Sequence, residues 1–410
     1  MQILWYANCS TKPKSFHLTK SENIWLLIVE LVLFMSTEQQ NAHATDTKHE
    51  PKINKYFRAA IKNRASDLHL KVGQTPKLRL FGDLKNTMGE VITSEKMEAL
   101  IYEILTPHQK EMLLKHGTLD FAYEIDGEHR FRTNLFRQRG MLSLVARRVE
   151  SNIPSFETLH LPDVLKTICQ SRSGLILVVG PTGCGKTTTI ASMINYINQT
   201  RHCHIVTIED PIEYLFKDEK ALVSQREIGL DAQDYDEALT YLMRQDPDVV
   251  FVGEARDFNT ITAGMRAAET GHLVFATLHS ANASQAIHRL LDLFPQNERD
   301  LVRQTLSLAI RAIVSQALVP SLIEGIDRIP AMEILIVNPA ARKMITEGRE
   351  SELPSIIRSS QHEGMQDITY ELVRLVKEGQ IDPKDAYKYA PNKDELKMVM
   401  KGITTTDGIL

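Results

Sequence analysis

Cysteine is scarce in this sequence: four occur among 410 residues, and no two of them form a CxxC pair. Their spacing predicts neither a zinc site nor a disulfide framework, and it favours reduced thiols in a cytosolic protein. Excess charge of either sign is also lacking, because 48 basic and 52 acidic residues leave a net charge of −4. This balance argues against a protein that coats nucleic acid by bulk charge, although local patches remain open.

Long hydrophobic runs are few, and the one membrane candidate is Ile24–Met35. As a helix it would extend roughly 18 Å, against about 30 Å of bilayer hydrocarbon, and Glu30 interrupts it. Preceding lysines and the AHA sequence at 42–44 suit a secretory signal peptide. We favour a third interpretation, in which Met35 rather than Met1 is the true first residue and no segment spans the membrane.

Hydrophobic residues make up 43% of the chain and charged residues 24%. This composition supports a folded core and excludes collagen-like, low-complexity and globally disordered chains. Shifts in residue pattern predict five segments. These are 1–50, a disordered or misassigned extension; 51–150, a smaller domain; 151–162, a linker; 163–338, a larger domain; and 339–410, a mostly helical region and tail.

The smaller domain is predicted to be α+β with an antiparallel sheet. Apolar residues at helical spacing predict helices over 53–62, 94–105 and 107–116. Alternating patterns predict strands over 65–70, 77–81, 119–125, 129–136 and 141–149, with a hairpin turn at Asp126-Gly127.

The larger domain is predicted to be a doubly wound α/β fold. Continuous apolar runs at 175–179, 204–208, 249–252 and 273–277 are typical of buried parallel strands. Helical patterns at 187–197, 236–244 and 261–268 separate them in a βαβ order. In the C-terminal region, Gly348, Gly364 and Gly379 predict helix ends.

A glycine-rich loop follows the first of these runs. Its residues read GPTGCGKT, which fits G-x-x-x-x-G-K-[ST], and the loop lies between a strand and a helix as this motif requires. Glycines let backbone N–H groups surround phosphate oxygens, and the helix N-terminus adds positive charge. The residues expected to bind a nucleotide are Gly180, Pro181, Thr182, Gly183, Cys184, Gly185, Lys186, Thr187 and Thr188.

Two side chains of this loop have defined roles in the motif. Lys186 contacts the β- and γ-phosphates, and the Thr187 hydroxyl binds Mg²⁺. Cys184 lies where a helix N-terminus could lower a thiol pKa and sensitise the protein to thiol reagents, but we favour a role as a small structural side chain. The loop alone indicates nucleotide binding, without deciding hydrolysis or the work done.

Acidic residues follow two of the predicted strands. After the run that ends at 252, Gly253 leaves room beside a γ-phosphate, and we interpret Glu254 as the carboxylate that orients an attacking water. An ion pair with Arg256 is the alternative. Glu209 and Asp210 should face the same crevice and hold water around Mg²⁺, because ligands bind at the carboxyl ends of such strands. A plain acidic turn is the alternative there.

Histidines and arginines supply further candidates. His279 follows one apolar run and could sense the γ-phosphate, whereas His272 precedes that run and suits a subunit contact. Arg130 and Arg132 share one strand face in a segment rich in arginine. A solvated face is the ordinary interpretation. The functional one is an arginine supplied to a γ-phosphate, in cis or by a ring neighbour, which accelerates transfer about 10³–10⁵-fold.

Several segments together resemble one known family. They are ASDLHL, HRFRTNLFRQRG, GPTGCGKTTT, TIEDPIEY, SQREIG, QDPDVVFVGEARD, AAETGHLVFATLHS and EGMQDITYELV. Over about residues 51–390 the chain is similar to the PilT-like type IV pilus retraction ATPases of the secretion ATPase superfamily. The resemblance implies a PAS-like N-terminal domain, a RecA-like P-loop domain with a parallel-rich sheet, and C-terminal helices.

The resemblance also implies an activity and partners. It implies a homo-hexamer that hydrolyses ATP with Mg²⁺ at subunit interfaces and drives pilus retraction and twitching motility. Such a protein is cytoplasmic, peripheral at the inner face of the plasma membrane, and contacts an inner-membrane pilus platform protein rather than nucleic acid.

By match to the family motifs, individual residues take on roles. Glu254 becomes the catalytic Walker B glutamate, and Glu209 lies in the acidic box. His272 and His279 form the histidine box. Arg132 and Arg147 match arginines thought to reach the γ-phosphate. The implied metal-binding residues are Thr187, Glu209 and Glu254.

The sequence departs from the family pattern at Cys184, where Ser is usual, at Ala255, where Met is usual, and over 340–344, where AARKM replaces an AIRNL-type run. These differences leave open an accessory retraction role or another secretion-system ATPase. Pilus-extension and type II secretion relatives usually carry a paired-CxxC insertion that this chain lacks. A nucleic-acid motor would need a basic or aromatic track facing DNA, and the C-terminal domain shows no such run. The presence of both Lys186 and Glu254 argues against a non-enzymatic scaffold.

Overall fold

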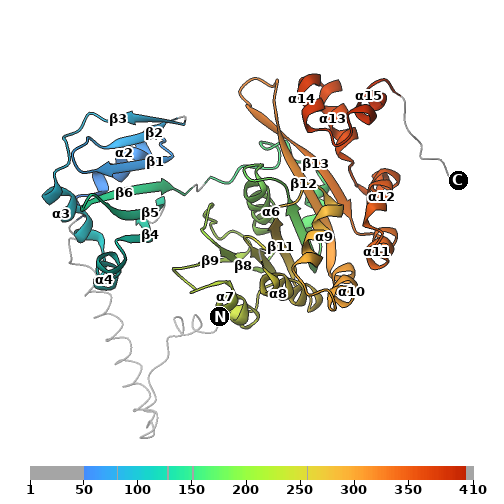
Figure 1. The fold of residues 1–410 in the computed structure, drawn as a ribbon, viewed down its shortest axis with the longest axis horizontal. Coiled ribbons are helices and arrows are strands. Elements are labelled where there is room, and N and C mark those ends of the chain that lie inside the picture. The colour runs from blue at the N-terminus through green and yellow to red at the C-terminus, as the bar shows by residue number, and fades with distance from the viewer. Residues whose placement is uncertain (1–49, 81, 127–128, 150–151, 256, 403–410) are drawn as a thin grey trace, which may run out of the picture. The chain divides into compact units, whose positions relative to one another are not determined.

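The fold is described from a computed structural model over residues 50–80, 82–126, 129–149, 152–255 and 257–402. These described residues fall in two units: residues 50–54 belong to the first, and residues 55–402 belong to the second. The second unit contains a smaller and a larger sheet, each with its own helices (Figure 1). The run Ile24–Met35 and the interpretations attached to it lie outside the described residues. Within the described residues, no helix combines the length and apolarity needed to cross a bilayer.

The smaller sheet is antiparallel, as the sequence predicts, with strand order β3-β2-β1-β6-β5-β4. Its strands are β1 (Asp67–Lys71), β2 (Lys77–Leu80), β3 (Asp83–Asn86), β4 (Thr118–Ile125), β5 (His129–Gln138) and β6 (Met141–Arg148). The helices of this region are α2 (Asn54–Lys62), α3 (Ser94–Ile104) and α4 (Pro107–His116).

One face of this sheet is apolar and the other is polar. Along β5, Phe131, Thr133 and Leu135 are buried whereas Arg132 is exposed. This alternation follows from the period of two in a strand. Strand β3 was not predicted, because all four of its residues are exposed and carry no buried pattern.

The larger sheet has seven strands in the order β13-β12-β7-β11-β10-β8-β9. They are β7 (Gly174–Val179), β8 (His204–Glu209), β9 (Leu222–Glu227), β10 (Val249–Val252), β11 (Leu273–Leu278), β12 (Ile310–Pro320) and β13 (Arg328–Ile336). Only the β12–β13 pair is antiparallel. The four predicted strands are confirmed, and β9, β12 and β13 were missed.

Helices cover both faces of the larger sheet, as in a doubly wound fold. Alternate residues of β7 belong to opposite cores: Leu175 and Leu177 to one, Ile176 and Val178 to the other. The first core includes residues of α7 (Tyr235–Leu242), α8 (Phe258–Glu269), α9 (Ala283–Asp292), α10 (Arg299–Ala309), α11 (Pro339–Thr346) and α12 (Leu353–Ser359). The second includes residues of α5 (Val164–Cys169) and α6 (Lys186–Thr200).

The predicted linker over 151–162 forms no helix or strand where it is described, but it packs against the second core. The ring of Phe156 is buried, and its centroid lies 5.6 Å from that of Tyr196 on α6. Residues 157–161 therefore run beside α6, a position that matters for the site below.

The C-terminal region is helical, as predicted. After α12 it continues with α13 (Ile368–Lys377), α14 (Pro383–Tyr389) and α15 (Lys393–Met400), which pack on residues of β12 and β13 (Figure 1). Short 3₁₀ turns are η1 (Met243–Gln245), η2 (Glu350–Glu352) and η3 (Gln361–Glu363). Gly348, Gly364 and Gly379 take positive φ after helical segments, where glycine is favoured. The domain boundaries and the PAS-like and RecA-like assignments remain predictions.

Candidate nucleotide site

The glycine-rich loop connects β7 to α6. Gly180 has φ of 152°, and a Cβ there would lie 2.4 Å from the carbonyl oxygen of Gln316 and 2.6 Å from Cys184 Sγ. Gly185 takes a left-handed φ of 87° as the residue before α6. The loop can therefore close tightly against β12 only with glycine at these points, and it leaves the first N–H groups of α6 without helical partners.

Lys186 is 8% exposed and folds back over this loop. Its Nζ donates hydrogen bonds to the carbonyl oxygens of Gly180 (2.9 Å) and Pro181 (3.0 Å). It also lies 3.4 Å from Nδ1 of His279. Burial lowers the pKa of the Lys186 ammonium, which makes an anionic partner favourable at this position.

Glu254 and His279 meet at the ends of neighbouring strands. Strands β10 and β11 are parallel and adjacent, so the residues that follow them emerge at the same edge of the sheet. His279 Nε2 lies 3.4 Å from Glu254 Oε1. The imidazole of His279 thus stands between the Lys186 ammonium and the Glu254 carboxylate.

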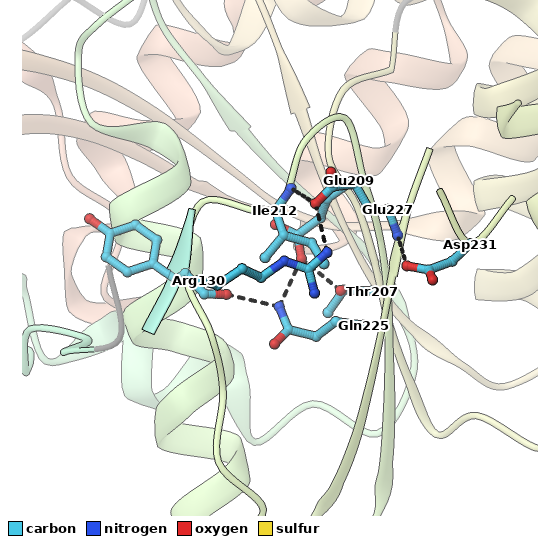
Figure 2. A network of polar contacts seen from close by, with 8 residues as sticks. Arg130, Thr207, Glu209, Ile212, Gln225, Glu227 and Asp231 are labelled. Atoms are coloured by element: carbon cyan, nitrogen blue, oxygen red, sulfur yellow. Dashed lines mark hydrogen bonds and ion pairs between the residues drawn. The ribbon is translucent and has the colours of Figure 1, made fainter. Parts of the chain in front are cut away.

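Glu209 lies at the end of β8 and is 4% exposed. Its Oε1 accepts hydrogen bonds from Thr207 Oγ1 (2.6 Å) and Gln225 Nε2 (3.2 Å), as Figure 2 shows. Thr207 and Gln225 are opposite each other in the β8–β9 register. Burial raises the pKa of Glu209 to about 7, against the lowering effect of these hydrogen bonds.

A second carboxylate, Glu227, organises the turn that follows Glu209. Its Oε2 accepts hydrogen bonds from the Ile212 backbone N–H (3.4 Å) and from Arg130 Nη2 (3.2 Å) (Figure 2). The Glu227 backbone N–H donates to Asp231 Oδ2 (2.9 Å). The acidic turn is therefore held by side chains of β9 and β5 rather than by its own backbone alone.

Lys186, Glu209, Glu254 and His279 all line one cavity of about 200 Å³. Its lining comprises Thr182, Gly183, Lys186, Thr187, Glu209, Asp210, Pro211, Glu213, Tyr235, Phe251, Gly253, Glu254, Thr277 and His279. The structure therefore brings together Lys186, Thr187, Glu209, Glu254 and His279, as the sequence led us to expect. Arg256, the alternative partner for Glu254, lies outside the described residues.

Other loop residues face a second cavity, of about 290 Å³, lined by Gly185 and Thr188. Leu159 and Leu161, from the segment 151–162 that was predicted to be a linker, line this second cavity together with Leu318 of β12. The Thr188 hydroxyl lies 3.0 Å from Tyr214 Oη. Residues from the start of α6 thus line both cavities: Lys186 and Thr187 the first, Thr188 and Thr189 the second.

The remaining sequence candidates lie on other elements. Arg132 and Arg147 are opposite each other in the β5–β6 register of the smaller sheet. Arg147 Nε donates to Asp67 Oδ1 at 2.9 Å. His272 precedes β11, at the opposite end from His279, and its Nδ1 lies 2.9 Å from the Ala267 carbonyl oxygen.

Cys184 fits the small structural role favoured from the sequence rather than the alternative of a low thiol pKa. The side chain is buried beneath the loop, and this burial raises the pKa of its thiol even though Lys186 acts in the opposite direction. A buried thiol of raised pKa is a poor nucleophile, so the small structural role is the one that the geometry supports.

Four residues of the site were not singled out from sequence: Thr207, Gln225, Tyr235 and Gln316. Thr207 lies two residues before Glu209 and so on the same strand face, a signal that was present in the sequence. Gln316 Nε2 donates to the Cys184 carbonyl oxygen (2.6 Å), and its Oε1 accepts from Thr189 Oγ1 (2.7 Å). This role could not be predicted from a local sequence pattern, because Gln316 lies more than 120 residues from both partners.

Comparison with known proteins places this chain in a family. A family model described as type II/IV secretion system protein matches residues 42–380. The chain is 39% identical over 338 residues to the Pseudomonas aeruginosa protein named type IV pilus retractation ATPase PilT, which covers 82% of this chain and 98% of that protein. It is 36% identical over 349 residues to the type IV pilus ATPase PilU of the same organism, covering 85% and 91%.

A solved structure gives the same result. The crystal structure of the pilus retraction motor PilT with bound ADP superposes with a TM-score of 0.78 at 42% identity, covering 85% of this chain and 99% of that one. The residues matched by the family model, 42–380, include both sheets and the phosphate loop. The chain belongs to the type II/IV secretion system protein family, and within it this protein is an ATP hydrolase of the PilT and PilU kind.

Proposed function

We propose that this protein is a hexameric motor that hydrolyses ATP to drive type IV pilus retraction and hence twitching motility. The observation that carries the proposal is the convergence of Lys186, His279 and Glu254 in one cavity beside the phosphate loop. Its closeness to a relative named as a retraction ATPase supports the direction of the work.

In this proposal, the loop amides and Lys186 hold the β- and γ-phosphates. The Lys186 ammonium exchanges its two carbonyl partners for phosphate oxygens, which its low exposure makes favourable. Glu254 accepts a hydrogen bond from the attacking water and aligns it with the γ-phosphorus. His279, between the two, responds to the presence of the γ-phosphate.

The donor set in the charged cavity fits Mg²⁺. This ion prefers oxygen ligands and is held by one or two carboxylates together with substrate phosphates. Thr187, Glu209 and Glu254 line the cavity and supply hydroxyl and carboxylate oxygens. Bound Mg²⁺ would supply positive charge to offset the charge of the phosphates. Within the described residues, no group of three His, Cys, Asp or Glu side chains could hold a metal ion by itself. The phosphates of the nucleotide would therefore supply part of the Mg²⁺ coordination.

The nucleoside belongs in the second cavity. The triphosphate must lie along the start of α6, and this segment borders both cavities: Lys186 and Thr187 line the first, and Gly185 and Thr188 line the second. Leu159, Leu161 and Leu318 offer the apolar surface that a purine ring requires. ATP would then extend from one cavity to the other across the loop.

Arg132 and Arg147 complete the proposed machinery. In a ring of six copies, we propose that these arginines reach the γ-phosphate of a neighbouring subunit. Their placement side by side on the polar face of the smaller sheet supports this role. The ring would act in the cytoplasm at the inner face of the plasma membrane, on an inner-membrane pilus platform protein, without nucleic acid.

An accessory retraction motor is the second candidate. It is favoured by the similarity to PilU and by the sequence AARKM at 340–344, which forms most of α11. Another secretion-system ATPase of the same superfamily is a further alternative.

Deletion of the gene, followed by imaging of pilus length and twitching, tests the direction of the work. We expect hyperpiliated cells that do not twitch, because assembly would continue without retraction. Bald cells would refute retraction and indicate assembly. Normal retraction that weakens only under load would favour the accessory role.

A further inference from the structure

The polar face of the smaller sheet contains a cavity of about 380 Å³ that the ATPase activity does not use. Two rungs of the sheet form its floor. Lys77, His69 and Val145 lie in one rung, since His69 is opposite both of the others. Lys71, Ser143 and Phe136 form the next, since Ser143 is opposite both. All six side chains therefore share one face.

The charge of this cavity is positive. Its lining includes two lysines and a histidine and no carboxylate. No ion pair joins Lys71 or Lys77 to another described residue. Asp67 lies on the same face two residues before His69, but Arg147 and Arg79 already bind it at 2.9 and 3.3 Å. Unopposed cations in a hollow attract an anion.

Besides burial, the positive charges around the cavity also lower the pKa of His69. Burial lowers the pKa of the imidazole first, and Arg79, Arg147 and Lys77 lower it further, with only Asp67 acting in the opposite direction. An anion bound beside the ring would therefore be expected to raise this pKa.

Two residues that line the cavity each carry a buried polar atom without a partner. Ser143 is 3% exposed, yet its Oγ has no hydrogen bond within the described structure, and neither does Nε2 of His69. Buried polar groups are ordinarily paired, so each of these atoms calls for a ligand or a water molecule. Next to them, Phe136 and Val145 offer apolar surface.

We propose that this cavity binds a small organic phosphate, separate from the nucleotide site. The anionic group is held by Lys71, Lys77 and His69, which come from the neighbouring strands β1 and β2 and line the cavity. Ser143 contributes a further hydrogen bond, and the organic part of the ligand lies on Phe136 and Val145. A volume of about 380 Å³ suits a small metabolite of this class.

Calorimetric titration with phenyl phosphate tests the proposal. The full chain carries Lys186→Ala in every arm, so that the phosphate loop contributes the same weakened background throughout. We expect saturable binding that Lys71→Met and Lys77→Met each weaken by about tenfold or more, because each removes a charged hydrogen bond. The matched control Lys85→Met removes an exposed lysine of β3 that does not line the cavity, and it should leave binding unchanged.

Inorganic phosphate and benzyl alcohol separate the contribution of the phosphate group to binding from that of the aromatic ring. Both should bind more weakly than phenyl phosphate. Equal binding of inorganic phosphate would overturn the organic class of ligand. Binding that is absent, or that both lysine variants leave intact, would overturn the site.

A local measurement guards against misfolding. NMR titration of the His69 ring, assigned with His69→Gln, should give a higher pKa when phenyl phosphate is present. Ser143→Ala should weaken binding while leaving this resonance in its folded position. A His69 pKa that is the same with and without phenyl phosphate would contradict the proposal even if calorimetry detected heat.

Discussion

The ammonium group of Lys186 lies among backbone carbonyls and an imidazole, with little contact with solvent. Replacement by alanine leaves the loop without its cation. We expect Lys186→Ala to reduce ATP turnover by at least about 10²–10³-fold, the cost typical of losing one donor that stabilises developing charge. Phosphate release measures this, with the exposed Lys220→Ala as control. Retained turnover would place the site elsewhere.

Glu254 should separate binding from hydrolysis. Glu254→Gln keeps the size of the side chain but removes the carboxylate that aligns water. We expect ATP to bind with near-normal affinity while turnover falls by about 10²–10⁴-fold, the usual contribution of general-base catalysis. Equilibrium binding and single-turnover rates distinguish the two effects. Glu219→Gln, an exposed change, serves as the control, and a near-normal rate for Glu254→Gln would refute its role.

Glu209 links function to stability through pH. Its pKa of about 7 in the fold is above the ordinary 4.5, so the folded chain binds the proton more tightly than the unfolded chain. Stability therefore falls as pH rises from about 4.5 to 7, and the cost is fully present above that range. Glu209→Gln retains an acceptor for Thr207 without this cost, and should be more stable at pH 8 by about 3 kcal/mol.

Denaturant unfolding without nucleotide or metal measures this gain. The gain should shrink at pH 5.5 and vanish below pH 4.5, where the unfolded carboxylate is also protonated. We also expect ATP turnover to fall, because the carboxylate is lost from the cavity. A stability gain of equal size at all pH values would show that the ionisation of Glu209 is not its cause.

At the scale of elements, β12 supports the phosphate loop from beside β7. Gln316 makes two hydrogen bonds there, to Cys184 and Thr189, in a buried setting. Gln316→Leu would leave both partners unpaired, at about 1–3 kcal/mol each. We expect a lower melting temperature and roughly tenfold weaker ADP binding. Calorimetry and fluorescence titration measure these, and the exposed Gln304→Leu is the control. Unchanged affinity would mean that the loop holds its shape without β12.

Whether a strand could be predicted from the sequence depended on how its residues are buried. The strands β7, β8, β10 and β11 are covered on both faces, and their continuous apolar runs revealed them. Strand β9 lies at the edge and reads LVSQRE, so it carries no such run. Strand β12 begins at Ile310 directly after α10 ends at Ala309, without the glycine or proline that would mark a boundary.

At the scale of the whole molecule, the proposed ring leads to a prediction about ATP turnover in rings that mix two variants. If Arg132 acts on a neighbour, a ring of Arg132→Ala subunits and a ring of Glu254→Gln subunits are each inactive. Mixed rings contain interfaces with an intact arginine and an intact glutamate, so partial ATP turnover should return. Mixing after dissociation, with turnover measured against the mixing ratio, tests this. Absence of recovery would favour action in cis or a structural role.

The sequence by itself determined the chemistry of this protein. The phosphate loop, Glu209, Glu254 and His279 are contiguous with predicted strands, and parallel strands deliver their carboxyl ends to one edge, so their meeting followed from local pattern. Only the tertiary structure decided the pairing of Gln225 with Glu209, the hydrogen bonds from Gln316 to the phosphate loop and the burial of Cys184, which raises the pKa of its thiol. These features depend on burial and on contacts between residues distant along the chain, which no local pattern records.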